Sequence, residues 1–301
     1  MNWFFIALGA PILWALVNHA DKYLLSKYFK GNNVGALVIF STIVAIVIAP
    51  ILYIVSPDVF DVSARDISLL IVSGVLYSIA ILFYLYALED GETSVVAPLF
   101  QLIPVFSFFL AYILLGEVIN GRQALGIIAV IAGSLIISLD PKKKFSVKKK
   151  ILLYMILASL SIALYEIFFK IAALDVGFAV SSFWQYIGVS LVGVFLFLFI
   201  KPYRNQFLKM IKAKPVFMII FNGASEMVTI VGNLLVNFAV LLAPVVLVLA
   251  VTNLQPIFVF LIGIILSLFF PKIGKEDMSR RSIIQKSLSI VIIIFGSYLI
   301  Y

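Results

Sequence analysis

Ten long apolar runs divide this sequence, and they limit what the chain can fold into more than any other feature. Most of them approach or exceed the ~20 residues that an α-helix needs to cross the hydrocarbon core of a bilayer. Strands of a membrane β-barrel would instead alternate over about ten residues, and these runs do not alternate. The runs are Trp3–Val17, Val34–Val55, Ile67–Leu88, Thr93–Leu115, Ala124–Leu139, Ile151–Leu174, Phe178–Ile200, Val216–Leu242, Val245–Phe270 and Ile283–Tyr301.

The composition agrees with a membrane protein. Hydrophobic residues make up 64% of the chain and charged residues 12%, against roughly 45–50% and about 25% in a soluble domain. So little polar surface cannot cover this apolar mass in water. We therefore predict an all-α integral membrane protein with ten transmembrane helices. The first run is expected to be a retained helix, since it lacks the features of a cleaved signal.

Basic residues are distributed unevenly between the two sides of the predicted bundle. All but three of the 22 Lys and Arg residues lie in loops that share one side, the exceptions being Arg65, Arg122 and Lys170. Cytoplasmic loops retain Lys and Arg, so we predict these loops in the cytoplasm and both termini outside, in a bacterial or archaeal cell membrane. The run Lys142–Lys150 is interpreted as a lipid-facing topology signal rather than a nucleic-acid patch.

The two halves of the sequence repeat each other. Gln101–Phe108 aligns with Asn253–Phe260, and Gly133–Ile137 aligns with Gly296–Ile300. Five helices per copy is an odd number, so the second copy must cross the membrane in the opposite direction, as in secondary transporters. We predict two inverted five-helix repeats: a first repeat at 1–140, a basic cytoplasmic linker at 141–150 and a second repeat at 151–301.

Short motifs in the first half resemble those of a known family. They are Trp14, Asn18, Asp21 and Lys22 at the end of the first helix, Ala87-Leu88 with Ser94 and Pro98, Pro104, and Leu115-Gly116-Glu117. The chain resembles the drug/metabolite transporter superfamily in its EamA-like branch. The resemblance implies a ten-helix carrier, in a group that exports amino acids, drugs and amines or exchanges sugar phosphates and nucleotide sugars. The second copy departs from the motif, because Phe269-Phe270 replaces the Gly-Glu pair.

The eighth run carries a polar stripe. At about 100° per residue its members fall within roughly 80° of one another on a helix. Isolated amides in membrane helices commonly form interhelical hydrogen bonds, and that is the alternative explanation. Five polar residues on one face favour the wall of a substrate cavity. The residues are Asn222, Glu226, Thr229, Asn233 and Asn237.

Two carboxylic residues lie deep in apolar runs and are candidates for proton or cation coupling. Glu226 in a cavity could alternate between binding a proton and binding substrate; a permanent partner would remove that role. Glu166 lies one helical turn before Lys170, the favoured order for an intrahelical pair, so the two could simply neutralise each other. In the first copy Asn18 and Lys22 occupy the matching positions, which also suggests a structural or gate position.

Further substrate contacts are predicted on four other helices. Gln101 and Asn253 each lie three residues before a proline, where freed carbonyls could coordinate a cation or bind substrate; a kink without a ligand is the alternative. Tyr77 and Trp14 could stack on a cationic or planar substrate, although simple packing explains them too. Asn18 completes this set.

The remaining motifs argue against catalysis. Cysteine is absent and only one histidine is present, so thiolate or histidine-cluster metal sites are excluded. No nucleotide-binding loop or nucleophile motif occurs. We expect no metal, cofactor, enzyme activity or nucleic-acid partner. The fifth and tenth helices, with Gly133 and Gly296, are predicted to be peripheral packing helices, which could also join two subunits in a homodimer.

The predicted function is secondary active transport of a small polar or amphipathic metabolite, such as an amine, amino acid or drug-like solute. Its partners would be this solute, the lipid bilayer and a coupling proton or cation. The alternatives are a non-transporting membrane scaffold or assembly protein, and a carrier of a lipid-linked or sugar-phosphate substrate.

Overall fold

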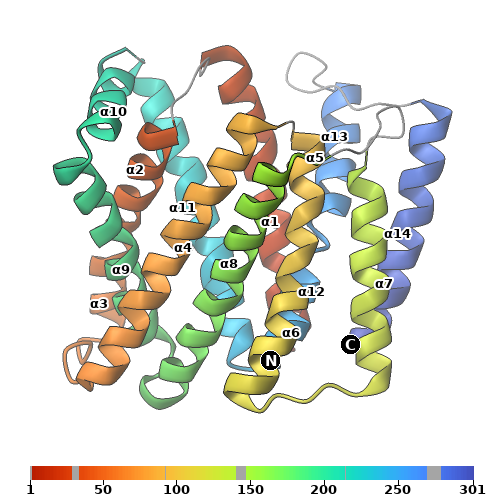
Figure 1. Ribbon diagram of the computed structural model, residues 1–301, viewed down its shortest axis with the longest axis horizontal. Coiled ribbons are helices and arrows are strands. Elements are labelled where there is room, and N and C mark those ends of the chain that lie inside the picture. Colours follow the sequence, from red (N-terminus) through yellow and green to blue (C-terminus); the bar gives the residue numbers. More distant parts are fainter. Residues whose placement is uncertain (1, 29–33, 92, 140–146, 214, 270–278) are drawn as a thin grey trace.

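A bundle of long helices standing side by side makes up the structure, a computed structural model (Figure 1). It describes residues 2–28, 34–91, 93–139, 147–213, 215–269 and 279–301. Within these ranges ten helical segments are long and apolar enough to cross a membrane, and no strand occurs. Helices satisfy their own backbone hydrogen bonds, which the interior of a bilayer demands because it contains no water. The prediction of an all-α, ten-helix membrane protein is confirmed.

Seven of the ten segments are single continuous helices, and three consist of shorter pieces. The short first and fifth runs extend into their polar flanks, as expected. The continuous segments are α1 (Trp3–Tyr28), α4 (Ala64–Asp90), α7 (Gly121–Ser138), α8 (Lys149–Val176), α9 (Phe178–Phe199), α11 (Val216–Val240) and α14 (Arg280–Ile300). The second segment comprises α2 (Val34–Val44), η1 (Ala45–Val47) and α3 (Ile48–Val55). The fourth comprises α5 (Thr93–Val96), η2 (Ala97–Gln101) and α6 (Leu102–Leu115), and the ninth α12 (Val245–Thr252) and α13 (Gln255–Phe269).

The fourth and ninth segments break at equivalent places. Gln101 precedes α6, and Asn253 lies between α12 and α13. Pro104 and Pro256 fall in the first turn of the helices that follow, where a missing N–H removes no helical hydrogen bond. The expected open carbonyl is occupied at one break, because the carbonyl of Asn253 accepts a hydrogen bond from Ser134 Oγ at 2.7 Å.

One helix was not expected. The basic loop after the seventh segment forms α10 (Lys201–Ala213), at the upper left in Figure 1. Its sequence is amphipathic, and its apolar face packs on α2, where Met210 is buried near Phe40. The Gln206 side chain also accepts a hydrogen bond from Gly35 N in the first turn of α2. The many basic residues gave this segment the composition of a polar loop, so the helical spacing of its few apolar residues was not recognised in the sequence.

Most of the extensive helix contacts join the two halves of the chain. α1 packs along α11, while α4 packs along both α8 and α9. α7 and α14 form a separate pair at one edge of the bundle, on the right in Figure 1. Neither half therefore forms a separate domain with a core of its own, and the polar residues on these facing helices meet between the halves.

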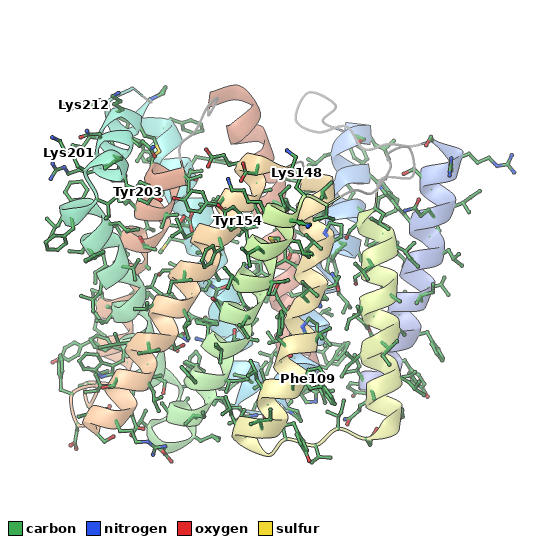
Figure 2. The ribbon with its side chains drawn as sticks, viewed as in Figure 1. Phe109, Lys148, Tyr154, Lys201, Tyr203 and Lys212 are labelled. Carbon is green, nitrogen blue, oxygen red and sulfur yellow. The ribbon has the colours of Figure 1, made fainter. Side chains whose placement is uncertain are left out.

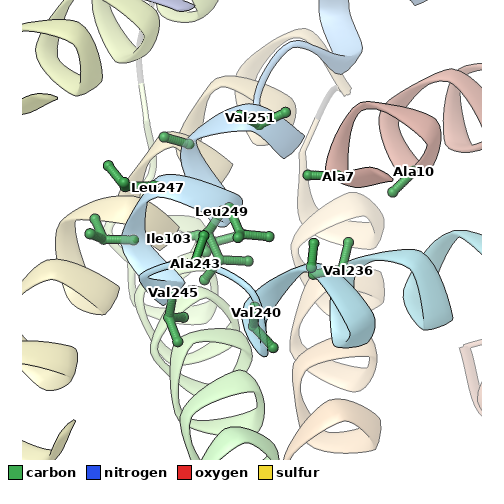
Figure 3. Packing of buried hydrophobic residues seen from close by; sticks show 14 of the residues in the cluster. Ala7, Ala10, Ile103, Val236, Val240, Ala243, Val245, Leu247, Leu249 and Val251 are labelled. Atoms are coloured by element: carbon green, nitrogen blue, oxygen red, sulfur yellow. The ribbon is translucent and has the colours of Figure 1, made fainter. Parts of the chain in front are cut away.

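The centre of the bundle is formed around α12. All eight of its residues are buried, as expected for a helix that is apolar on every side. Figure 3 shows its Leu247 and Leu249 near Ile103 of α6, while Val236 of α11 faces Ala7 and Ala10 of α1. The outer surface is also apolar, since residues such as Phe5, Ile54, Phe199, Phe217 and Phe269 are each more than half exposed. Such a surface suits contact with lipid chains.

The two ends of the bundle differ in charge. Both termini lie at the lower end in Figure 1, where Asn2 Nδ2 donates to Tyr301 Oη at 2.8 Å. Lys148, Lys201 and Lys212 lie at the opposite end, labelled in Figure 2. We call these the terminus end and the basic end. Several residues of the predicted topology signal, together with most of the linker 141–150, lie outside the described residues; they are Lys30, Lys142, Lys143, Lys144, Lys214, Lys272 and Lys275, and the side chains of Lys22 and Lys27.

Glycines allow α7 and α14 to approach closely. A Cβ added to Gly126 would lie 2.7 Å from the carbonyl oxygen of Gly296, and one on Gly296 would lie 2.8 Å from that of Gly126. Gly133 faces Ile293 of the same partner helix. These glycines therefore serve packing contacts within one chain, as predicted for the fifth and tenth helices. The homodimer itself stays a prediction.

Replacing Gly296 by alanine is expected to destabilise the fold. The added methyl group must push two backbones apart, which typically costs about 1–3 kcal/mol of unfolding free energy. Gly121→Ala is the matched control, because a Cβ there meets nothing within 4 Å. Both substitutions raise helix propensity, so a difference in stability between the two variants reports the close packing at Gly296. Denaturant unfolding in detergent measures the difference, and equal stability of the two variants would contradict the packing described here.

Candidate functional site

The predicted polar stripe on α11 faces the other helices of the bundle, and its burial increases towards the terminus end. Asn222, Glu226 and Thr229 are half-buried, whereas Asn233 is 6% exposed and Asn237 is fully buried. The stripe therefore passes from a partly accessible upper part into a sealed lower part. Its apolar neighbours Ile230 and Val236 belong to hydrophobic clusters.

A closed ring of hydrogen bonds surrounds the lower end of the stripe. Asn237 Nδ2 donates to Gln185 Oε1 at 2.6 Å, and Gln185 Nε2 donates to Ser73 Oγ at 2.8 Å. Ser73 Oγ donates to the carbonyl of Tyr165 at 2.8 Å, and Tyr165 Oη donates back to Asn237 Oδ1 at 3.2 Å. The ring joins α4 of the first half to α8, α9 and α11 of the second. All four side chains are buried.

Two members of this ring were missed by the sequence analysis. Gln185 is a single amide in the apolar seventh run, and Tyr165 resembles the many aromatic residues of the chain. An isolated buried amide is itself a signal, because it needs a partner in the membrane interior. Its partner could not be deduced from one sequence.

Tyr77 lies directly above the ring. Its hydroxyl accepts a hydrogen bond from Asn233 Nδ2 at 2.9 Å, and its ring centroid is 5.2 Å from that of Tyr165. Tyr186 of α9 donates its hydroxyl to the carbonyl of Ile230 at 3.3 Å. Three tyrosines from three helices thus surround Asn233. The structure thus places Tyr77, a predicted substrate contact, beside the stripe.

Glu226 lies nearer the basic end, on the half-buried part of the stripe. Its Oε1 accepts a hydrogen bond from Ser41 Oγ of α2. Trp14 of α1 donates its indole N–H to the carbonyl of Thr229 at 3.4 Å and packs against Gly232. Helices from both halves therefore contribute polar or aromatic side chains around the stripe.

The other predicted contacts occupy different surroundings. Gln101 and Asn253 are 5% and 7% exposed, and Gln101 Oε1 and Asn253 Nδ2 have no hydrogen-bond partner. Asn18 is exposed, unlike the buried residues of the ring. Trp184 also lies apart from the stripe, since its indole N–H donates to the carbonyl of Val59 at 2.6 Å within a packed cluster.

The expected intrahelical pair of Glu166 and Lys170 is replaced by a different ion pair. Lys170 Nζ lies 2.6 Å from Glu117 Oε1, beyond the end of α6, and donates to the carbonyl of Ala243 at 2.8 Å. Glu117 can reach α8 because Gly116 adopts φ 65°, a left-handed conformation that ends α6 and turns the chain. Helical spacing allowed the pair with Glu166, but only the tertiary fold brings Glu117 to Lys170.

The second oxygen of Glu117 extends this contact. Glu117 Oε2 accepts a hydrogen bond from Val245 N at 2.7 Å, in the first turn of α12. A carboxylate is stabilised there by the partial positive charge of a helix N-terminus. We call Glu117, Lys170, Ala243 and Val245 the terminus-end clamp, because they tie the ends of α6 and α8 to the connection between α11 and α12. Both charged side chains of the clamp are 11% exposed.

Among the described residues, no group of three or more acidic or histidine side chains is placed to hold a metal ion. The chemistry available at the site is therefore hydrogen bonding by amides and phenols, with carboxyl groups at Glu226 and Glu166. Such an arrangement suits binding of a polar solute.

Replacing Asn237 by alanine is expected to open the hydrogen-bond ring. Gln185 Oε1 and the Tyr165 hydroxyl would both lose a partner, and interhelical hydrogen bonds in membranes contribute about 0.6 kcal/mol each on average. With the cost of leaving buried groups unsatisfied, we expect a loss of about 1–2 kcal/mol in unfolding free energy. Ser297→Ala is the control, since that buried hydroxyl donates only within its own helix. A similar loss in both proteins would contradict a structural role for the ring.

Comparison with known proteins shows a similarity to one family over the first half of the chain. Residues 1–139 match the sequence model of the EamA-like transporter family. An uncharacterized transporter of Clostridium kluyveri is 26% identical over 145 residues, which are 48% of this chain and 46% of that protein. An uncharacterized protein of Methanocaldococcus jannaschii is 29% identical over 98 residues, 33% of this chain and 72% of that protein. The chain thus matches less than half the length of the Clostridium relative.

A solved crystal structure shares the fold. It superposes with a TM-score of 0.72 over 99% of this chain and 95% of that chain, at 13% sequence identity. This likeness concerns the fold alone. The family match agrees with the motifs of the first half and with the ten apolar helices, and residues 1–139 of the chain are similar to the EamA-like transporter family.

Proposed function

We propose that this protein is a secondary active transporter of a small polar or amphipathic metabolite, an amine, amino acid or drug-like solute. The observation that carries the proposal is the set of polar side chains that both halves direct towards the α11 stripe, inside an otherwise apolar bundle. Buried polar residues in a membrane are costly and commonly mark a substrate or ion pathway. The family supports a transporter rather than an enzyme.

Alternating access between two inverted repeats is the proposed mechanism. The helix contacts support it. α1 and α8 are the first segments of the two halves, and α4 and α11 are the third. The contact of α1 with α11 therefore has a counterpart in the contact of α8 with α4, and both contacts are extensive. α7 and α14 are the fifth segments of the two halves, so their contact is its own counterpart. Rocking of one repeat against the other would then expose the site first at one end and then at the other.

The burial of the stripe indicates from which end of the bundle a solute could reach it in this conformation. Asn237 and its hydrogen-bond ring are sealed, and the terminus-end clamp closes the same end. Glu226 and Asn222 are half-buried towards the basic end. We infer that solute reaches Glu226 from the basic end, which the charge rule assigns to the cytoplasm.

Charge favours a cationic or zwitterionic solute. Glu226 is a carboxyl group on the accessible part of the stripe, while Lys170, the one cation buried near the site among the described residues, is engaged by Glu117. A sugar phosphate would require basic partners that the described stripe does not offer. A scaffold protein is the second alternative, and it would not need this stripe.

A ligand screen tests the proposal first. The unmodified protein in detergent is heated with a panel of amines, amino acids and sugar phosphates. A ligand at about 100 times its dissociation constant adds ~2.7 kcal/mol to the stability of the folded state. Stabilisation by amines or amino acids, followed by their uptake into proteoliposomes, is the expected outcome. Stabilisation by sugar phosphates alone would contradict the proposed charge preference.

Replacing Glu226 by glutamine is expected to weaken binding of a cationic solute. A hydrogen bond to a charged group contributes about 1.5–3 kcal/mol, so affinity should fall about ten- to a hundredfold. Glu89→Gln is the matched control, because Glu89 is an exposed carboxyl group at the end of α4. Equilibrium binding and uptake are measured across pH. If Glu226→Gln keeps the affinity and the pH profile of the parent protein, Glu226 neither binds the solute nor couples its transport.

The proposed topology is tested by cysteine labelling, which has no background because the chain contains no cysteine. Gly121→Cys, exposed at the terminus end, should react with a membrane-impermeant maleimide added to intact cells. Lys209→Cys on α10 should react only after permeabilisation. The reverse pattern would place the basic end outside and invert the inferred direction of access.

A further inference from the structure

Glu166 is a buried carboxyl group without its expected counter-ion. It lies on α8, its residue is 3% exposed, and its Oε2 has no hydrogen-bond partner. The nearest cation along the helix, Lys170, is held by Glu117 at 2.6 Å. An unpaired carboxylate in a membrane interior costs several kcal/mol, and such a group normally takes up a proton instead.

The groups around Glu166 offer no other source of neutralisation. Tyr77 of α4, Tyr186 of α9 and the neighbouring Tyr165 all interact electrostatically with it. Glu226 of α11 is itself acidic and supplies no positive charge. On the α6 side Glu117 is paired, and no other cation among the described residues lies on these facing helices near Glu166. A neutral carboxylic acid therefore fits this position.

Lys170 lies within reach of both carboxyl groups. Residues four apart on a helix are neighbours, about 5–6 Å between their Cβ atoms, and a Glu before a Lys is the favoured order. In the present conformation Lys170 instead spans to Glu117 and to the carbonyl of Ala243. Its ammonium group therefore has two alternative carboxyl partners, one of which closes the terminus-end clamp.

We propose that Glu166 is a proton-binding site that controls the terminus-end clamp through Lys170. With Glu166 protonated, Lys170 pairs with Glu117 and the terminus end is closed. When Glu166 gives its proton to water, its carboxylate draws the Lys170 ammonium group one turn along α8. Glu117 keeps the hydrogen bond from Val245 N, but the clamp loses its ion pair.

This inference rests on the proposed function and names its coupling ion. Proton loss would favour opening at the terminus end, and proton uptake would favour the closed state described here. Each transport cycle would then move one proton through Glu166. The site differs from Glu226, which is half-buried and bonded to Ser41 near the other end of the stripe.

Single-cysteine accessibility of the full chain in lipid nanodiscs tests the switch without any transported solute. Ala243→Cys places a thiol beside the clamp at a residue that is 8% exposed. Its maleimide reaction rate is divided by that of Gly121→Cys, an exposed position at the same end, which corrects for the titration of the thiol itself. One proton linked to opening changes the open population about tenfold per pH unit. We expect the ratio to rise with pH, by up to about tenfold per pH unit within the titration of Glu166.

The variants make the prediction specific. In the Ala243→Cys background, Glu166→Gln imitates the protonated form and should keep the ratio low at every pH. Glu117→Gln removes the ion pair but retains an oxygen for Val245 N, so the ratio should be high at every pH. A ratio that does not respond to pH in the parent protein overturns the proposal. A Glu166→Gln protein that keeps the full response also overturns it.

Infrared spectroscopy provides a readout that needs no variant at Glu166. The unmodified protein should show the carbonyl band of a protonated carboxylic acid at neutral pH, and the band should vanish over the same pH range as labelling increases. Absence of the band overturns the proton site. Labelling that depends on pH in a protein that moves no solute would contradict the proposed function and leave the proton site standing. Transport with labelling independent of pH would contradict the proton site and leave the proposed function standing.

Discussion

A bilayer interior contains no water to satisfy polar groups, and every other feature of this protein depends on that constraint. It requires the backbone groups to be hydrogen-bonded within the protein, as they are in these helices, and it makes a polar side chain without a partner costly. Asn237, Gln185, Ser73 and Tyr165 answer this requirement together, because each donates one hydrogen bond to the next in a closed ring. The same ring joins the two halves of the chain, so satisfying the polar groups also determines how the halves contact each other.

Three glutamates show how strongly surroundings decide the role of one side chain. Glu117 has a lysine and a helix N-terminus as partners and is a stable carboxylate in the terminus-end clamp. Glu226 is half-buried beside a serine, where it could meet a solute from the basic end. Glu166 is buried with an unpartnered oxygen. The same functional group thus serves a structural contact, a proposed solute contact and a proposed proton site.

The close helix contacts explain how a bundle with few polar residues can still be specific. Lipid chains are as apolar as leucine, so association between membrane helices depends on close packing and on hydrogen bonds. Gly126 and Gly296 bring α7 and α14 together at one edge, and Gly74 allows α4 to approach the backbone of α9 near Gln185. The second contact lies next to the hydrogen-bond ring. Packing and polar recognition therefore support each other where the two halves meet.

The sequence by itself determined the ten helices, the membrane class, the family resemblance and the polar face of α11, because these follow from local periodicity and from short motifs. It also brought Tyr77 and Trp14 into the predicted site. Only the tertiary structure decided the partners: Gln185 with Asn237, Ser41 with Glu226, and Glu117 rather than Glu166 with Lys170. Helical spacing determines which residues share a face, but contacts between residues far apart in the chain depend on how the helices pack. For the same reason α10 and the contact between Gly126 and Gly296 could not be deduced from a single sequence.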